Sequence, residues 1–425
     1  MRGQRGLFEA VSPHSDGRAE SFVGELRAFV YDGRRTDEGL TNAGGRDGPR
    51  FRVPTFVNEF WTSRQRSAHS LHEVSYRACF KPQLPRFFIE RLTAPGDVVY
   101  DPFMGRGTTL LEAALLERRV AGCDVNPLSR ILVGPRLRPP MLARVRDRLD
   151  DLDLTTPGEE PRELEVFYHP ETLAEICALR DYLLRRSAAG LSDEVDDWVR
   201  MVAVNRLTGH SPGFFSVYTL PPNQAASIES QRKINVRRHQ VPPRRDVKAI
   251  ILKKTRSLLA DGDGDLSARL QARATPVLVT GSARRTPELA DGSVDLVVTS
   301  PPFLDVVDYA GDNWLRCWFC GIDPNGVDIT IARRLDQWAR AMAEVLVELH
   351  RVVRPAGRVA FEVGEVRRGT VRLEEAVIPA AASAGWTPEA VVINTQVFTK
   401  TANCWGVTNN AKGTNTNRIV VLRRG

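Results

Sequence analysis

The stretch VVYDPFMGRGTT, residues 98–109, decides the fold. Its apolar start predicts a short buried strand over residues 98–100, and its two glycines predict a tight turn into an amphipathic helix over Thr108–Arg119. A second apolar strand follows over residues 120–123. Strand, turn, helix and strand form the repeating unit of a parallel sheet with helices on both faces, so the sequence predicts an α/β protein.

The same rhythm returns in the last third of the chain. Five further apolar runs predict strands, at residues 276–280, 294–298, 358–363, 391–393 and 419–422. An amphipathic helix is predicted over residues 335–353, and the last two strands are predicted to form a terminal hairpin. With the first two strands, these runs give a sheet of seven.

Residues 136–274 interrupt this pattern. Their apolar residues recur at helical spacing, in one stripe from Leu173 to Leu184 and in another from Val195 to Val202 that begins after the cap residue Ser192 and ends at Gly209. We therefore predict a largely helical insertion in a catalytic domain made of residues 51–135 and 275–425. Residues 1–50 bury little and are predicted to be a flexible N-terminal arm with one short helix.

Composition excludes several classes of protein. The 42% apolar content can form a sizeable core, whereas no apolar run approaches the roughly 18 residues of a membrane span and no signal-peptide pattern opens the chain. The six cysteines are too sparse for a disulfide framework, and Cys317 with Cys320 is only half of a zinc site, so no metal is predicted. The sequence predicts a soluble, cytoplasmic protein without membrane association.

The glycine turn carries the first chemical signal. Gly105 and Gly107 remove side chains where a bound molecule must approach, but the turn lacks the lysine of a phosphate-binding loop and the third glycine of a dinucleotide fingerprint. Asp101 precedes the turn and suits an ammonium group, while Asp124 ends the second strand, where a carboxylate can accept both hydroxyls of a ribose. Ribose and ammonium without phosphate indicate S-adenosylmethionine. The alternative is that the two acids only cap the helices that follow.

The second signal is TSPPF, residues 299–303, directly after another predicted strand. Two prolines form a stiff platform whose carbonyls can accept hydrogen bonds from an amino group, and Phe303 offers a face on which a base can stack. Taken alone, the segment is equally compatible with an ordinary strand terminator that exposes an aromatic ring.

Together these segments resemble the S-adenosylmethionine-dependent DNA amino-methyltransferases. DPFMGRGTT is similar to their cofactor motif, GCDVNP (residues 122–127) to their second-strand acid and TSPPF to their catalytic motif, while HEVSYRACFKPQLP (residues 72–85) resembles the segment that folds over the methionine end. The resemblance implies a Rossmann-like, seven-stranded methyltransferase sheet whose insertion recognises the DNA target. The cofactor residues that it implies are Phe80, Asp101, Pro102, Phe103, Gly105, Gly107, Thr108, Thr109, Asp124, Asn126 and Ser282.

The resemblance also implies a reaction. Ser300, Pro301, Pro302 and Phe303 would hold a cytosine flipped out of duplex DNA, and methyl transfer to its exocyclic N4 would need no covalent intermediate. Serine at the first position is typical of the N4-cytosine branch, whereas Asp or Asn there is typical of the N6-adenine branch. One departure is Ser282, where relatives often carry an acid for the cofactor's adenine amino group. An N6-adenine enzyme, an RNA amino-methyltransferase and a non-catalytic DNA-binding module remain alternatives.

The positive charge of the chain is concentrated in one place. The whole chain carries +7, and residues 231–256 alone hold ten Lys and Arg against one Asp. Because the paired arginines and Pro242–Pro243 disfavour a regular helix before Asp246, we interpret the segment as a DNA contact and not as a solvated helix face. The DNA-binding residues predicted from it are Arg232, Lys233, Arg237, Arg238, Arg244 and Arg245.

Two further loops are candidates for the base pocket, residues 305–313 with Asp308, Tyr309 and Asp312, and the Asn-rich segment 398–418. The acids of the first loop could equally hold only the loop itself. Prokaryotic methyltransferases of this kind can be paired with a cognate restriction endonuclease in a restriction-modification system. The sequence leaves that partner, the recognition site and the oligomeric state open.

Overall fold

A computed structural model describes most of the chain. The described residues are 19–44, 49–62, 68–77, 79–155, 160–262, 265–272, 275–302, 309–327, 334–366, 371–395 and 416–425.

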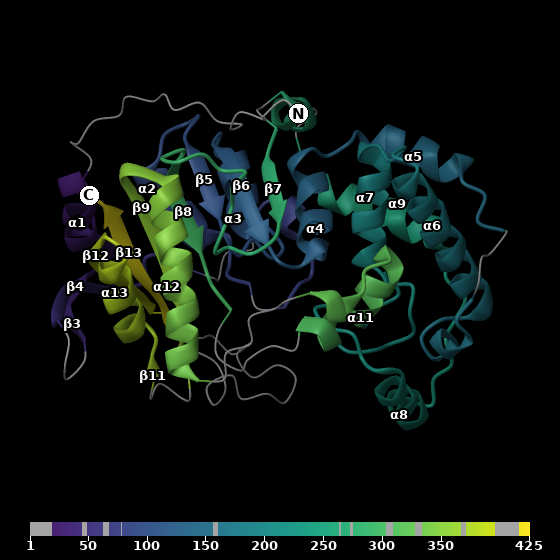
Figure 1. Cartoon of the computed structure of the whole chain (residues 1–425). Coiled ribbons are helices and arrows are strands. Elements are labelled where there is room, and N and C mark those ends of the chain that lie inside the picture. The colour runs from purple at the N-terminus through teal and green to yellow at the C-terminus, as the bar shows by residue number, and fades with distance from the viewer. Residues whose placement is uncertain are drawn as a thin grey trace.

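The predicted seven strands are all present in one mostly parallel sheet (Figure 1). In chain order they are β5 (Val98–Asp101), β6 (Arg119–Asp124), β7 (Val277–Thr280), β8 (Val294–Thr299), β9 (Val353–Val363), β12 (Trp386–Thr395) and β13 (Thr416–Arg424). Their spatial order is β7-β6-β5-β8-β9-β13-β12, and β13 runs antiparallel to both of its neighbours. The α/β fold and the terminal hairpin predicted from the sequence are therefore confirmed.

The N-terminal segment adds two strands to this sheet. After α1 (Ala19–Ala28) and the small pair β1 (Val30–Tyr31) and β2 (Arg34–Arg35), β3 (Asp37–Ala43) pairs with β4 (Phe51–Asn58), which lies parallel to β12. The predicted short helix is present, but the rest of residues 19–43 is more structured than the predicted flexible arm. The reason is that β4 offers a free strand edge on which the polar segment 37–43 can form backbone hydrogen bonds.

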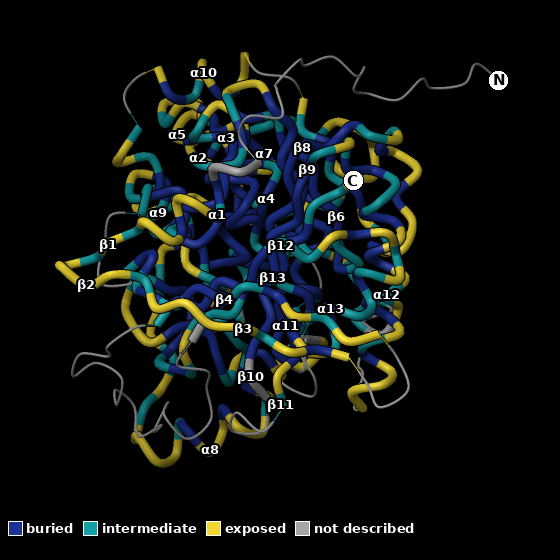
Figure 2. The backbone as a smooth tube through the Cα atoms, turned by 90° about the vertical axis from the view of Figure 1, so that its left-hand side faces the viewer, coloured by how far each residue is buried: buried dark blue, intermediate teal, exposed yellow. Residues whose placement is uncertain are grey.

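Helices cover both faces of the sheet. On one face, α12 (Leu335–Val352) and α13 (Glu374–Ser383) pack on alternate strand residues such as Val98 and Tyr100. On the other face, residues such as Val99 contact α2 (Gln83–Leu92) and α3 (Thr108–Leu115). The strand residues are buried in both directions, which explains their continuous apolar runs (Figure 2). The helix α3 is one turn shorter than predicted because the chain reverses at Glu117, with φ +71°, to begin β6.

The insertion is helical, as predicted. After α4 (Pro127–Leu137) it contains α5 (Leu142–Asp151), η3 (Arg162–Val166), α6 (Pro170–Ala188), α7 (Glu194–Val204), α8 (Ile228–Arg238), α9 (Val247–Leu258) and α10 (Leu266–Gln271). Figure 1 shows α5, α6, α7 and α9 grouped beside the sheet, beyond α4. Buried residues of these helices join the core that covers the α2 and α3 face of the sheet.

Three local predictions in the insertion are wrong. The helix α7 ends at Val204, before the predicted stop at Gly209. Asp193, not Ser192, caps α7, because its carboxylate accepts from the backbone of both Val195 and Asp196 in a capping box. The basic segment does form a regular helix before Asp246, since α8 ends at Arg238, four residues before Pro242 and Pro243. The prolines break only the connection to α9, which Asp246 caps.

The remaining elements are α11 (Tyr309–Cys320), η2 (Ser70–His72), η4 (Pro324–Gly326), β10 (Glu365–Val366) and β11 (Val371–Arg372). Cys317 is buried on α11 and Cys320 is partly buried, as free thiols. Among the described residues there is no group of His, Cys, Asp and Glu side chains that could hold a metal ion. None of the described helices is long and apolar enough to cross a membrane.

Candidate active site

Two motifs that are 200 residues apart in the chain meet where the strand order reverses. Strand β5 leads to β6 on one side and pairs directly with β8 on the other, with Tyr100 opposite Val297. The segments after these two strands therefore lie side by side. The hydroxyl of Thr299 donates a hydrogen bond of 2.6 Å to the carboxylate of Asp101, which also accepts from the backbone N–H of Phe103. In sheets of this kind, ligands bind in the crevice at such a reversal.

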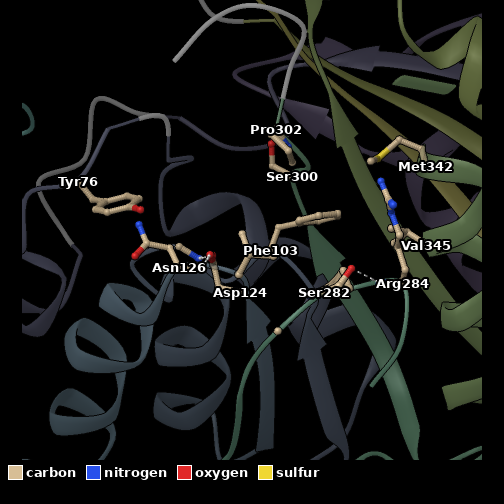
Figure 3. A pocket seen from close by; sticks show the side chains of 15 residues that line it. Tyr76, Phe103, Asp124, Asn126, Ser282, Arg284, Ser300, Pro302, Met342 and Val345 are labelled. Atoms are coloured by element: carbon tan, nitrogen blue, oxygen red, sulfur yellow. Dashed lines mark hydrogen bonds between the residues drawn. The ribbon is translucent and has the colours of Figure 1, made fainter. Parts of the chain in front are cut away.

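A cleft of about 790 Å³ opens at this point (Figure 3). It brings together eight of the residues predicted from the sequence, namely Pro102, Phe103, Gly105, Asp124, Asn126, Ser282, Ser300 and Pro302. Figure 3 shows Asp124 and Asn126 on one side of Phe103, and Ser282 with Arg284 on the other.

The carboxylate of Asp124 is held in place by two backbone groups. Its two oxygens accept hydrogen bonds from the N–H of Gly105, at 2.8 Å, and from the N–H of Asn126, at 2.9 Å. A carboxylate has about four acceptor positions, so Asp124 can still accept from a hydroxyl of a ligand beside these two N–H groups and the side chain of Ser129. The residue that caps α4 is Asn126, whose side chain accepts a hydrogen bond from the N–H of Leu128. The alternative in which Asp124 serves only as a helix cap is therefore not favoured, because Asp124 is not the cap of α4.

Asp101 forms the floor of a smaller cavity beside the cleft. This cavity is also lined by Phe80, Phe103, Gly105, Thr108 and Ser300. Burial raises the pKa of the Asp101 carboxyl to about 7, and the hydrogen bonds from Thr299 and Phe103 oppose that shift only in part. A cation bound in the small cavity would favour the ionised form of Asp101.

The segment over the small cavity is fixed to the cofactor motif. The backbone carbonyl of Val74 accepts a hydrogen bond of 2.8 Å from Arg106, and His72 contacts Glu112 of α3 at 2.7 Å. These contacts place Tyr76 and Phe80 on the cavity wall. The segment 72–85 therefore lies where the sequence predicted that it would fold over a ligand.

Two predicted cofactor residues lie behind the cleft instead of lining it. Gly107 has φ +75°, and a β-carbon there would lie 2.5 Å from a methyl of Val133, so its glycine is required for packing on α4. Thr109 is fully buried and donates to the carbonyl of Val298, which ties α3 to β8. Gly105 also has a positive φ, of +47°, but it does line the cleft.

The described part of the segment that the sequence predicted to be catalytic, residues 300–302, is braced from two sides. The indole N–H of Trp338 on α12 donates a hydrogen bond of 2.8 Å to the carbonyl of Pro302. Ser300 hydrogen-bonds Glu362 near the end of β9, and Asn417 donates to the same carboxyl. Pro301 is buried and does not line the cleft, whereas Ser300 lines both cavities.

Glu362 is a site residue that the sequence reasoning missed. Burial raises the pKa of its carboxyl to about 7, against hydrogen bonds from Asn417 and Ser300 that lower it. A single acid in the otherwise apolar run VAFEV, residues 359–363, is the signal that could have identified it. Tyr76, Arg284, Met342 and Val345 also line the cleft and were not predicted. Of these, only Tyr76 lies in a motif segment that had been singled out.

Part of the predicted base pocket falls outside the described residues. This applies to Phe303, Asp305 and Asp308, and to residues 398–415 of the Asn-rich segment. Asp312, on α11, pairs with Arg77 at 2.8 Å. For Asp312, therefore, the structure favours the alternative in which the acid holds its own segment.

The basic segment 231–256 divides into exposed and neutralised charges. Arg232, Lys233, Arg237 and Arg238 are exposed on α8; Lys233 pairs with Glu229, and the guanidinium of Arg238 stacks on the ring of Tyr218 at 3.8 Å. Arg244 is paired with two glutamates of α6, and Arg245 is partly buried. In Figure 2, α8 lies at the same end of the molecule as β10 and β11, which follow the carboxyl end of β9.

Parts of the chain are similar to known DNA methylases. Residues 48–129 match the N6/N4 methyltransferase family model, described as DNA methylase. The chain is 30% identical to the type II methyltransferase M.MvaI of Kocuria varians over 33% of its length, and 30% identical to M.MjaII of Methanocaldococcus jannaschii over 21%. It is 21% identical to M.BsoBI of Geobacillus stearothermophilus over 63% of its length. The matches span 27% of the length of M.MvaI, 16% of M.MjaII and 56% of M.BsoBI.

Solved structures share only a distant likeness. The match to a geranyl diphosphate methyltransferase in complex with GPP and sinefungin has 10% sequence identity and a TM-score of 0.32. It covers 81% of this chain and 78% of the methyltransferase chain. The rRNA methyltransferase aviRa of Streptomyces viridochromogenes is 14% identical and covers 83% and 89%, with a TM-score of 0.33. Likenesses this low carry no conclusion about the activity.

The residues of the two cavities fit S-adenosylmethionine, the cofactor predicted from the sequence. Asp124 offers free acceptor positions for a ribose, and Asp101 offers a carboxyl suited to an ammonium group in the adjoining cavity. The family match covers both acids, whereas Ser300 and Pro302 lie outside it.

Proposed function

We propose that the protein is a DNA methyltransferase that transfers a methyl group from S-adenosylmethionine to the N4 amino group of a flipped-out cytosine. The observation that carries this proposal is the hydrogen bond between Thr299 and Asp101, which joins the catalytic motif to the cofactor motif at the point where the strand order reverses. In this arrangement a base held at Ser300 lies next to a cofactor held by Asp124.

The cofactor, when bound, supplies an activated methyl group. The chain itself binds and orients. Asp124 holds the ribose, Asp101 faces the ammonium group from the small cavity, and Phe103 lies between the two sides of the cleft. Positioning of two reactants in this way can provide much of a methyl-transfer rate.

The role of Ser300 follows from its hydrogen bond with Glu362. If the serine proton points to the carboxylate, both lone pairs of the hydroxyl oxygen are directed away from Glu362 and can accept from the amino group of the base. The amine gains positive charge as it attacks, which strengthens that hydrogen bond. Its surplus proton can then pass through Ser300 to Glu362, whose pKa of about 7 suits a proton acceptor near neutral pH.

The other residues of the tetrapeptide have roles different from that of Ser300. Pro302 already accepts a hydrogen bond from Trp338, so its carbonyl fixes the loop and is less available to a substrate. Phe303 is proposed to stack on the base, as the sequence resemblance implies. Serine at position 300 is the feature that favours cytosine N4 over adenine N6.

Transfer of a labelled methyl group from S-adenosylmethionine tests this function. We expect label in duplex DNA, little in structured RNA, and loss of transfer in Ser300→Ala with duplex binding retained. Transfer to RNA alone would favour an RNA methyltransferase. Duplex binding without any transfer by the unaltered protein would favour a DNA-binding module. A cytoplasmic location and a partner restriction endonuclease belong to the same proposal and need separate tests in the host cell.

A further inference from the structure

A second and more open pocket, of about 970 Å³, lies on the far side of Tyr76 from the cleft. We call it the basic pocket. It is formed by three parts of the chain: the segment from His72 to Lys81, Arg106 of the cofactor turn, and the insertion, which contributes Arg206, residues 221–223 and Lys254. The pocket therefore joins the cofactor-binding half of the protein to the insertion.

Positive charge dominates the wall of the basic pocket. Lys81, Arg106, Arg206 and Lys254 line it, and Glu73 is its one acid. Glu73 is paired with Lys254 at 2.9 Å. Among the described residues, Lys81, Arg106 and Arg206 form no ion pair with a carboxylate. Glu73 compensates the charge of Arg206 only from a distance and is itself paired with Lys254, so the pocket keeps an excess of positive charge.

Arg206 is held in a fixed orientation with part of its guanidinium unused. Its Nε donates to the carbonyl of Asn205 at 2.7 Å, and its guanidinium carbon lies 4.0 Å from the centre of the Phe214 ring. In the part of the chain that the structure describes, its two terminal nitrogens have no hydrogen-bond partner. Burial lowers the pKa of this guanidinium to about 10, which indicates that its charge is poorly compensated in the protein alone. An anion in the pocket would supply that compensation.

We propose that the basic pocket binds a phosphodiester group of the DNA backbone beside the target base, through Arg206, Lys81 and Arg106. This inference rests on the proposed function. Arginine and lysine side chains make most contacts to DNA phosphates, and these contacts fix the position of the duplex without reading its sequence. A backbone phosphate held across Tyr76 from the cleft would set the distance between the duplex and the flipped base.

The carboxylate of the cofactor is the competing occupant. It would be a smaller anion, and its binding site would adjoin the small cavity, which shares Tyr76, Cys79 and Arg106 with the basic pocket. Arg206 and Lys81 line only the basic pocket, so substitutions at these two positions separate the alternatives.

The test measures duplex affinity against salt concentration for Arg206→Met, Lys81→Met and the double variant, with S-adenosylhomocysteine present. Because one phosphate is bound by several side chains, the double variant should reduce the slope of log K against log salt by about 0.9, and each single variant should reduce it by part of that amount and weaken binding about tenfold at moderate salt. Arg206→Lys should recover most of the affinity. Arg185→Met, an exposed arginine on α6, is the matched control and should leave the slope unchanged.

The possible outcomes are distinct. An unchanged slope in both single variants would overturn the proposal, and so would loss of S-adenosylmethionine affinity, measured by calorimetry, without loss of duplex affinity. Lys81 is exposed, so Lys81→Met tests the pocket even if Arg206→Met is poorly folded. Failure of the unaltered protein to bind any duplex would instead refute the proposed function.

Discussion

Glu362→Gln is expected to stabilise the protein while impairing methyl transfer. The carboxyl of Glu362 has its pKa raised by burial from an ordinary value of 4.5 to about 7. The unfolded chain therefore loses this proton at lower pH than the folded chain does. The contribution of Glu362 to stability falls as pH rises from about 4.5 to about 7, and above that range the buried carboxylate destabilises the fold by roughly 3 kcal/mol.

Glutamine has the same shape and cannot ionise. Its carbonyl can still accept from Asn417, and its amide can donate to Ser300, whose hydroxyl can rotate to accept. The free energy of unfolding of the variant should match that of the unaltered protein near pH 5 and exceed it by up to about 3 kcal/mol at pH 8. Methyl transfer should fall by about 100-fold or more, because the proton acceptor is lost.

Urea unfolding at a series of pH values, with methyl transfer measured on the same samples, provides the assay. Glu163→Gln is a matched control, since Glu163 is exposed on η3 and its removal should leave both properties unchanged. Parallel stability profiles for Glu362→Gln and the unaltered protein between pH 5 and pH 8 would refute the account of the buried carboxyl. Full methyl transfer by the variant would refute its role as proton acceptor.

Three further predictions concern the cofactor, the turn and the basic helix. Asp124→Ala should weaken S-adenosylmethionine binding about 100-fold in calorimetry, because two hydrogen bonds to a carboxylate are lost, and unchanged affinity would remove Asp124 from the site. Gly107→Ala should lower the free energy of unfolding by about 2 to 4 kcal/mol in urea titrations, because a β-carbon meets Val133 at a positive φ; a loss below 1 kcal/mol would show that the turn relaxes. Replacing Arg237 and Arg238 together by Ala should reduce the slope of log K for duplex binding against log salt by the amount expected for about two phosphate contacts. An unchanged slope would mean that α8 faces solvent.

The sequence was a good guide wherever local pattern decides structure. Apolar runs ending in Asp101, Asp124 and Thr299 predicted three strands of the sheet, because strands buried on both faces leave a continuous signal. The motifs that carry the family resemblance also contain eight of the residues that line the cleft, because the carboxyl ends of adjacent parallel strands open on one edge.

Features that depend on tertiary contacts were harder to predict. The polar strand β3 exists because β4 offers it an edge, and Gly107 is required by Val133 and not by a ligand. The basic helix α8 was not predicted because Pro242 was taken to disfavour a helix in the whole segment. The helix ends at Arg238, a full helical turn before that proline. Glu362 is buried because β9 lies between β8 and β13 in the sheet. The residues next to Glu362 in the sequence do not reveal these two neighbouring strands.

Mass analysis of nucleosides from duplex DNA treated with the protein and S-adenosylmethionine tests the proposed function most directly. We expect N4-methylcytosine, with its yield lost in Ser300→Ala. N6-methyladenine or 5-methylcytosine alone would contradict the assignment to the amino group of cytosine.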